Sequence, residues 1–421
     1  MAGAPRDGGA VRGPLIRITL ANLGFAQVLY LSLLVILPDQ SARIGGSAHK
    51  TTVLAVVAAV GALVALIAAV GAGHLSDRRL AATGSRGGVL AVGAVLGGVL
   101  LAVLPVTGSV ALLLVVWCGV QIGLNGVLSV VTAALADWFS VERRGVASAY
   151  AALGQVLGAV VASVLVLVLS AHPAIVSATG GLLFLLTVAP MIRPPYALGA
   201  QAAPTDEPTA DEAAKEQEQP TDAPRAPGER GPYVDVALAW SVRVVVTFSN
   251  TLVVTFLNYY VTDVLRPANP QRLVGLAAGL TSLMVAVGAV LSGRASDRLQ
   301  RRRPFVIASV VVMCLGELLL AGWQNVPGAL IAAALVGFGY GVYLAVDQAL
   351  SADVLPHSRA YGRDFGIMNT ATAFPQIIAP AVAAVLLGSS AQSAHYSFLF
   401  AVGALTALSG VGFVLPIKRV R

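Results

Sequence analysis

Long apolar runs recur along this chain, and each is close to the length needed to cross a lipid bilayer. The hydrocarbon core is about 30 Å thick, so a spanning helix needs roughly 20 mostly apolar residues. Only 11% of the 421 residues are charged, whereas a typical water-soluble domain carries roughly 25%. Because lipid offers backbone polar groups no water, each run must pair its own backbone as a helix. The sequence therefore predicts an all-α polytopic membrane protein.

About twelve runs meet this length criterion, and they fall into two sets of six. The first set covers 16–37, 51–72, 87–105, 109–136, 145–170 and 173–192. The second set covers 236–262, 272–293, 304–322, 327–351, 362–387 and 395–416. Pro38 is expected to end the first helix, because proline interrupts helices. We predict two pseudo-symmetric six-helix bundles, an N-terminal bundle over 16–192 and a C-terminal bundle over 233–416.

The segment 193–232 between the two sets differs from both in composition. It is rich in proline and holds eight acidic residues from Asp206 to Glu229, with almost nothing large and apolar. Such a composition cannot bury a core. We predict a disordered cytoplasmic linker here and cytoplasmic tails over 1–15 and 417–421.

Basic residues concentrate on one side of the predicted helices. Arg43, Lys50, Arg266 and Arg272 fall on the other side and Arg243 lies within a helix, which leaves 22 of the 27 basic residues on the first side. Cytoplasmic loops carry the excess of Lys and Arg in multi-pass membrane proteins. We therefore expect both termini in the cytoplasm and the chain in the cytoplasmic (inner) membrane.

A charged motif occurs in both halves of the chain. Asp77 and Arg78 follow the second predicted helix after Gly73, and Asp297 and Arg298 follow the eighth, 220 residues later. Matching signals at matching places indicate an internal repeat. Contacts between such charges can form in one conformation and break in another. The alternative is a solvated turn with ordinary cytoplasmic charge.

Gly73, Asp77 and Arg78 give the chain a resemblance to the major facilitator superfamily, over nearly its whole length outside the tails and the linker. The glycine that the family places shortly after the arginine is displaced here to Gly84. The resemblance implies alternating access and a central cavity lined by helices 1, 4, 7 and 10. We expect the cytoplasmic gate to comprise Asp77, Arg78, Asp137, Arg144, Asp297, Arg298, Asp353 and Arg363.

Two short segments carry a narrower resemblance. The stretches 349–356 and 301–305 are similar to parts of the sugar–cation symporters, although Gln300 stands where that pattern has glycine. This resemblance implies a sugar-like substrate.

Polar residues spaced three and four apart form stripes on several predicted helices, where polar side chains usually face a cavity or another helix. Ser and Thr can instead bond their own helix backbone, and amides can join neighbouring helices. We predict that the substrate is bound by Asn22, Gln121, Asn125, Thr251, Asn258, Tyr340, Tyr343 and Gln376.

Asp347 is the strongest candidate for proton coupling, because it is an acidic residue within a long apolar helix. The alternative is that it pairs with the basic loops nearby. Glu317 is expected to pack or to snorkel toward the outer face, Arg243 to snorkel toward lipid phosphates, and Asp263 to lie on the outer surface.

A secondary active transporter is the predicted function. The sequence has no G-x-x-x-x-G-K-[ST] loop for ATP, so a proton or other ion gradient is the expected energy source. The preferred hypothesis is uptake of a sugar-like solute, and export of a drug-like compound or metabolite is the alternative. The five histidines are scattered, which argues against a membrane enzyme. A receptor that does not transport is a further alternative. We expect a monomer in lipid with no cofactor, metal or nucleic acid.

Overall fold

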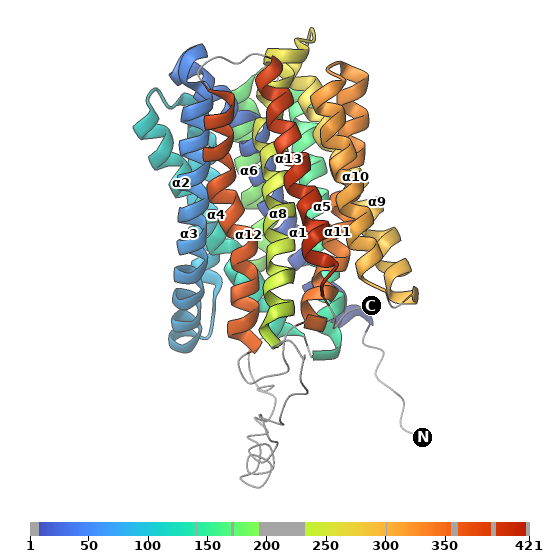
Figure 1. Cartoon of the computed structure of the whole chain (residues 1–421). Helices are drawn as coiled ribbons and strands as arrows, with labels where there is room; N and C mark the ends of the chain where they lie inside the picture. The colour runs from blue at the N-terminus through green and yellow to red at the C-terminus, as the bar shows by residue number, and fades with distance from the viewer. Residues whose placement is uncertain are drawn as a thin grey trace.

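Helices that stand side by side make up the protein (Figure 1). The computed structural model describes residues 8–139, 141–169, 172–192, 232–299, 301–354, 361–388 and 393–417. The predicted linker, apart from Pro232, lies outside the described residues. The first helix, α1, begins and the last helix, α13, ends at the lower end of the molecule in Figure 1, and this end is called the terminal end below.

The N-terminal half forms one group of helices. Its elements are α1 (Gly8–Leu31), the π-helical η1 (Ser32–Ile36), α2 (Leu37–Thr83), α3 (Gly87–Val103), the short η2 (Leu104–Val106), α4 (Val110–Trp138), α5 (Val141–Leu169) and α6 (Pro173–Ile192). Within this group α1 packs on α5 and α6, and α4 packs on α2 and α3.

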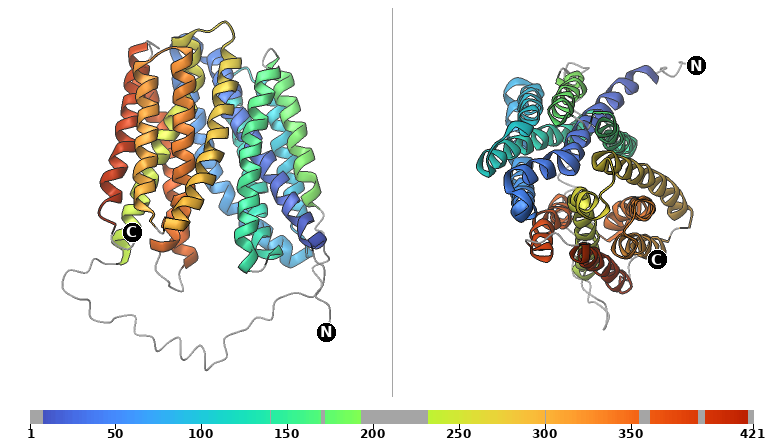
Figure 2. Two further views of the ribbon diagram at one scale, coloured as in Figure 1. Left: turned by 90° about the vertical axis from the view of Figure 1, so that its right-hand side faces the viewer. Right: turned by 90° about the horizontal axis from the view of Figure 1, so that it is seen from above.

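The C-terminal half forms a second group. Its elements are α8 (Pro232–Tyr260), the π-helical η3 (Val261–Leu265), α9 (Pro270–Leu299), α10 (Arg303–Gly322), α11 (Val326–Val354), α12 (Tyr361–Leu387) and α13 (Ser393–Val414). Figure 2 shows the two groups next to each other, blue to green and yellow to red. They meet where α5 packs on α9 and α2 packs on α12.

Eleven stretches of the described chain are long and apolar enough to cross a membrane. The first, Arg12–Thr83, has 72 residues, far more than the roughly 20 that one crossing needs. Gly46 interrupts it with a left-handed φ of 60°, a conformation that glycine adopts without steric cost.

The break expected at Pro38 is wrong. The helix continues through Pro38, which follows the π-helical turn of η1 and sits at the start of α2. Pro38 has no N–H to donate to the Leu34 carbonyl, and this carbonyl instead accepts a hydrogen bond from the Asn258 side chain. The chain therefore leaves helical geometry at Gly46, near the other end of the predicted loop.

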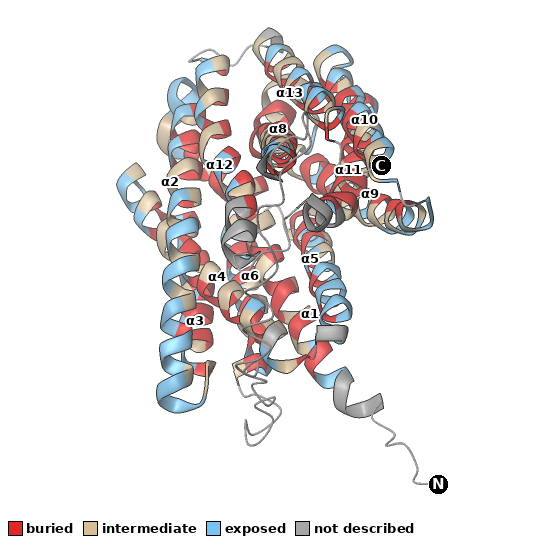
Figure 3. Ribbon diagram, turned by 60° about the horizontal axis from the view of Figure 1, so that its bottom comes forward, coloured by how far each residue is buried: buried red, intermediate tan, exposed pale blue. Residues whose placement is uncertain are grey.

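Small residues let the helices approach closely. A Cβ atom on Gly123 of α4 would lie 2.5 Å from the Gly97 nitrogen and 2.6 Å from the Gly93 oxygen of α3. Such backbone contact is a common way for membrane helices to associate. Figure 3 shows exposed residues along the outward faces of α2 and α3. Large apolar residues such as Ile67, Val70, Val92 and Val95 are among the exposed ones, which suits a protein surrounded by lipid.

Candidate functional site

A cavity of about 420 Å³ lies between the two groups of helices. Its wall comes from α1, η1 and α5 on one side and from α8, α9, α10 and α11 on the other. Most of the lining is Ala, Val and Leu. The described residues that line it include no charged side chain, and the polar ones are Tyr30, Gln155, Asn250, Thr281, Ser282 and Tyr340. Such a site suits a small uncharged molecule that has hydrogen-bonding groups.

Four of the predicted substrate ligands line this cavity or contact a residue of its wall: Tyr340, Asn22, Asn258 and Tyr343. Tyr340 lines it directly. Asn22 of α1 is buried and accepts a hydrogen bond of 3.1 Å from the Gln155 side chain, which lines the cavity. Asn22 also donates to the Ile18 carbonyl, so it holds Gln155 in place from behind.

The stripe on α4 faces a neighbouring helix instead. Gln121 donates to the Gly61 carbonyl of α2 at 3.3 Å, and Asn125 donates to the Gln121 carbonyl at 2.9 Å. Neither lines the central cavity. Gln121 therefore joins α4 to α2, which is the alternative given above for amides, whereas Asn125 bonds its own helix.

Thr251, Asn258 and Gln376 do not line the cavity themselves. Thr251 donates to the Thr247 carbonyl within α8, and Asn258 donates to the Leu34 carbonyl of η1. Gln376 of α12 is exposed and is not part of the lining. Their role as substrate ligands stays a prediction.

Sequence reasoning missed most of the polar residues that line the cavity. Asn250 shares its face of α8 with Val253, Val254 and Leu257, so this face does not form a polar stripe. A search for stripes therefore selects the neighbouring face with Thr247 and Thr251. Tyr30, Thr281 and Ser282 are single polar residues in apolar surroundings and carry no periodic signal.

Asp347 lies behind the cavity in a buried cluster. Its carboxylate is 2.5 Å from the Arg243 guanidinium and accepts a hydrogen bond of 2.8 Å from Tyr343. Tyr343 stacks on Tyr340 with ring centroids 6.3 Å apart, which links the cluster to the cavity wall. Arg243 also donates to the Met368 carbonyl of α12.

This cluster corrects two expectations. Arg243 does not snorkel toward lipid phosphates, because it is only 4% exposed and pairs with Asp347. Asp347 is 3% exposed and pairs with this arginine of α8, not with the basic loops. Predicted substrate ligand Tyr343 contacts Asp347 and does not line the cavity.

Glu317 of α10 is fully buried and accepts a hydrogen bond from Ser249 of α8. Its other oxygen faces Gly403 of α13. The expectation that it packs between helices agrees with this position, whereas snorkelling toward the outer face does not.

Several polar contacts join the two groups of helices at the end opposite the terminal end. Lys50 of α2 forms an ion pair of 2.5 Å with Asp263 of η3, and Tyr396 of α13 donates to the same carboxylate at 2.8 Å. Gln271 of α9 donates to Asp39 of α2 at 2.9 Å. Asp263 is therefore a contact between the groups at this end, and its side chain remains 14% exposed.

The sequence and this architecture agree with one family. A sequence model described as Major Facilitator Superfamily matches residues 18–265 and 239–420. The chain belongs to the Major Facilitator Superfamily. It is thus a multi-pass membrane transporter and not an enzyme.

Curated relatives of this facilitator match shorter segments. One is the "Probable 4-methylmuconolactone transporter" of Cupriavidus pinatubonensis, 33% identical over 35% of this chain and 33% of the relative. Another is the "Probable polyol transporter 6" of Arabidopsis thaliana, 35% identical over 19% of this chain and 16% of the relative. The chain thus spans a third or less of the length of these relatives in the matched regions.

Solved structures resemble the facilitator over nearly its full length. A peptide transporter, POT, superposes with a TM-score of 0.72 at 13% identity, covering 97% of this chain and 95% of that chain. A bacterial homolog to the human lysosomal transporter Spinster gives a TM-score of 0.64 at 14% identity, with 98% and 96% covered. At such identities the similarity establishes the fold alone.

The motif loop of the facilitator is organised by an arginine that sequence reasoning missed. Arg86 contacts Asp77 at 2.6 Å, Asp137 at 2.9 Å and the buried Ser76 hydroxyl at 2.8 Å. Burial lowers and the two carboxylates raise the pKa of Arg86, and the net shift is upward. This cluster joins α2 to α4 at the terminal end.

The other predicted gate residues take different positions. Arg144 donates to the Phe139 carbonyl at 3.4 Å, and Arg78 and Arg298 are exposed. Asp137, also a predicted gate residue, pairs with Arg86. The side chains of Asp297, Asp353 and Arg363 lie outside the described parts of the chain.

Proposed function

We propose that this facilitator is a secondary active transporter that moves a small, uncharged, hydroxylated solute by alternating access. The observation that carries this proposal is the cavity between the two groups of helices, with amide and hydroxyl side chains and no charged side chain among its described lining. Hydrogen bonds from these groups would orient a neutral polar solute, whereas an ionic solute would find no counter-charge there.

A twelve-helix topology underlies the proposal. The 72-residue stretch that breaks at Gly46 crosses the membrane twice, which gives two pseudo-symmetric bundles over 16–192 and 233–416. A repeated bond supports the pseudo-symmetry: Arg86 donates to Ser76 and Arg302 donates to Ser296, both at 2.8 Å. The excess of basic residues favours cytoplasmic termini and insertion of a monomer in the cytoplasmic membrane.

Contacts at the end opposite the termini support alternating access. The Lys50–Asp263 ion pair and the Gln271–Asp39 hydrogen bond close the outer side of the cavity. They must break when the bundles rock to admit solute from outside. The Asp77–Arg86–Asp137 cluster is part of the gate on the cytoplasmic side.

Proton coupling is assigned to Asp347. Its carboxylate is shared between Arg243 and Tyr343, and Tyr343 stacks on the cavity-lining Tyr340. A solute that displaces Tyr340 would disturb these contacts and favour protonation of Asp347. Transport would thereby depend on the proton gradient.

The substrate is assigned to the polyol or sugar-like class, in line with the name of the relative from Arabidopsis. Export of an amphipathic drug-like compound or metabolite is the second candidate. The mostly apolar lining of the cavity favours it, because apolar walls with a few polar groups also suit amphipathic molecules.

Counterflow in proteoliposomes tests the proposal. Purified protein should exchange a radiolabelled neutral polyol or sugar, and Asn250→Ala should weaken apparent affinity about fivefold through loss of one hydrogen bond. Thr132→Ala is the matched control, because Thr132 lies on α4 away from the cavity and bonds its own helix. Exchange of amphipathic cations but of no polyol or sugar would contradict the assigned substrate class.

A further inference from the structure

We propose that a groove on the lipid-facing side of the N-terminal half binds one acyl chain of an anionic phospholipid, with the lipid phosphate at Arg79. The groove has a volume of about 720 Å³. Its lining comes from α2, α3 and α4 only. It shares no lining residue with the central cavity, so it is a separate site.

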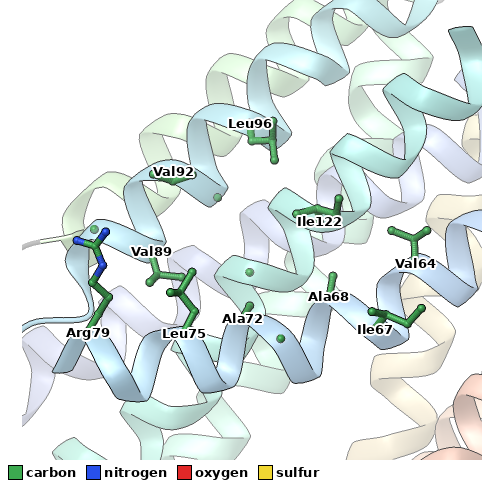
Figure 4. A pocket seen from close by; sticks show the side chains of 14 residues that line it. Val64, Ile67, Ala68, Ala72, Leu75, Arg79, Val89, Val92, Leu96 and Ile122 are labelled. Carbon is green, nitrogen blue, oxygen red and sulfur yellow. The ribbon is translucent and has the colours of Figure 1, made fainter. Parts of the chain in front are cut away.

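The lining of the groove is apolar except at one end. Figure 4 shows Arg79 at one end and Val64 at the other, with Leu75, Val89 and Ile122 among the side chains between them. All other lining residues are Gly, Ala, Val, Leu or Ile. An apolar groove that ends in a guanidinium matches a molecule with a hydrocarbon chain and an anionic head.

Packing against α4 explains why the groove exists. Gln121 and Ser129 of α4 donate to the Gly61 and Ala69 carbonyls and so hold α2 against α4. Gly123 brings α3 against α4 on the other side, as described above. Small residues then leave the space between α2 and α3 unfilled: Ala68, Gly71 and Ala72 on α2, Gly88 and Gly93 on α3, and Gly126 on α4.

The length of the groove fits one leaflet of the bilayer. Val64 and Arg79 are fifteen residues apart in α2, which is roughly 22 Å at 1.5 Å per residue. Half of a bilayer of about 40–45 Å, headgroup regions included, is roughly 20–22 Å. Arg79 near the end of α2 therefore lies at the headgroup level of the leaflet on the side of the chain termini.

The charge of Arg79 is available to a ligand. Its side chain is exposed, and none of the four ion pairs among the described residues includes it. The neighbouring carboxylate of Asp77 pairs with Arg86 instead. An anion from outside the protein can therefore pair with Arg79, and an anionic headgroup is favoured over a zwitterionic one.

Native mass spectrometry of the full chain tests the charge requirement. The protein is purified from nanodiscs that contain equal parts of phosphatidylglycerol and phosphatidylcholine, and the retained lipid is identified. Arg79→Gln should lower the preference for phosphatidylglycerol about fivefold. Arg78→Gln is the matched control, because it removes the same charge one residue away from the groove lining. Equal losses in both variants would overturn the proposal.

Filling the groove tests the acyl-chain contact. A Cβ on Gly71 meets no atom within 4 Å and Gly71 lines the groove, so the side chain of Gly71→Leu should fill the groove and abolish retention of the bound lipid. Gly73 is equally open but lies about 200° around the helix, so Gly73→Leu should leave retention unchanged. Lipid retention that survives Gly71→Leu, or a groove that takes neutral amphiphiles as readily as phosphatidylglycerol, would disprove the proposal. These readouts do not depend on transport, so they separate this proposal from the proposed function.

Discussion

At the scale of single residues, Asp347 of α11 and Arg243 of α8 form a buried ion pair. The two residues are 104 positions apart in the sequence, and no periodic pattern connects them. Burial of either charge alone is unfavourable, whereas the pair with its additional hydrogen bonds is tolerated. Each residue therefore depends on the other.

Removal of one charge should destabilise the protein. We expect Arg243→Gln to lower the free energy of unfolding by about 3–5 kcal/mol, because it leaves the Asp347 carboxylate buried without a cation. Thermal unfolding of the purified variant measures this loss. The double variant Arg243→Gln/Asp347→Asn should regain much of the stability, and a double variant no better than Arg243→Gln would argue against mutual compensation.

The proposed role of Asp347 in proton coupling gives a separate prediction. We expect Asp347→Asn to abolish accumulation driven by a pH gradient, because an amide cannot carry the proton, while counterflow without a gradient persists. Uptake into proteoliposomes with and without a pH gradient distinguishes gradient-driven accumulation from counterflow. Gradient-driven accumulation in a folded Asp347→Asn variant would exclude the proposed coupling role.

At the scale of helices, glycine contacts set how closely neighbours approach. Gly123 of α4 lies against the α3 backbone, while a Cβ on Gly126, one turn later, would have its nearest neighbour at 4.0 Å. The same residue type thus has different constraints at two neighbouring positions. Composition indicates that glycine suits membrane helices, but only the packing identifies the positions that require it.

These two glycines provide a matched test. We expect Gly123→Val to destabilise the protein by about 1–3 kcal/mol, because the added atoms must push α3 and α4 apart. Gly126→Val should have a much smaller effect on the same thermal unfolding measurement. Similar melting temperatures for both variants would show that the α3–α4 contact can relax at little cost.

At the scale of the whole molecule, the Lys50–Asp263 ion pair joins the two groups of helices. Its side chains are 13% and 14% exposed, and the ring of Tyr259 lies 4.9 Å from the lysine nitrogen. Because the pair spans the two halves, it biases the equilibrium between conformations and not the stability of one half.

Loss of this pair should favour opening at the end opposite the termini. We expect Asp263→Asn to accelerate about fivefold the labelling of Ser41→Cys, a buried position near this end, by a membrane-impermeant maleimide. Cys118→Ala and Cys314→Ala remove the background thiols. The charge exchange Lys50→Asp/Asp263→Lys should slow labelling again, and unchanged labelling in Asp263→Asn would mean that the pair does not hold the halves together.

The apolar run lengths alone determined that this chain is helical and embedded in a membrane, because lipid requires about 20 apolar residues and internal backbone pairing for each crossing. The residues Gly73, Asp77 and Arg78 indicated the family. The sequence could not reveal that Arg86 holds Asp77 and Asp137, that Arg243 meets Asp347, or that Asn250 and not Gln121 lines the cavity. Those pairings depend on the rotation and packing of helices that are distant in the chain, and only the tertiary structure decides these.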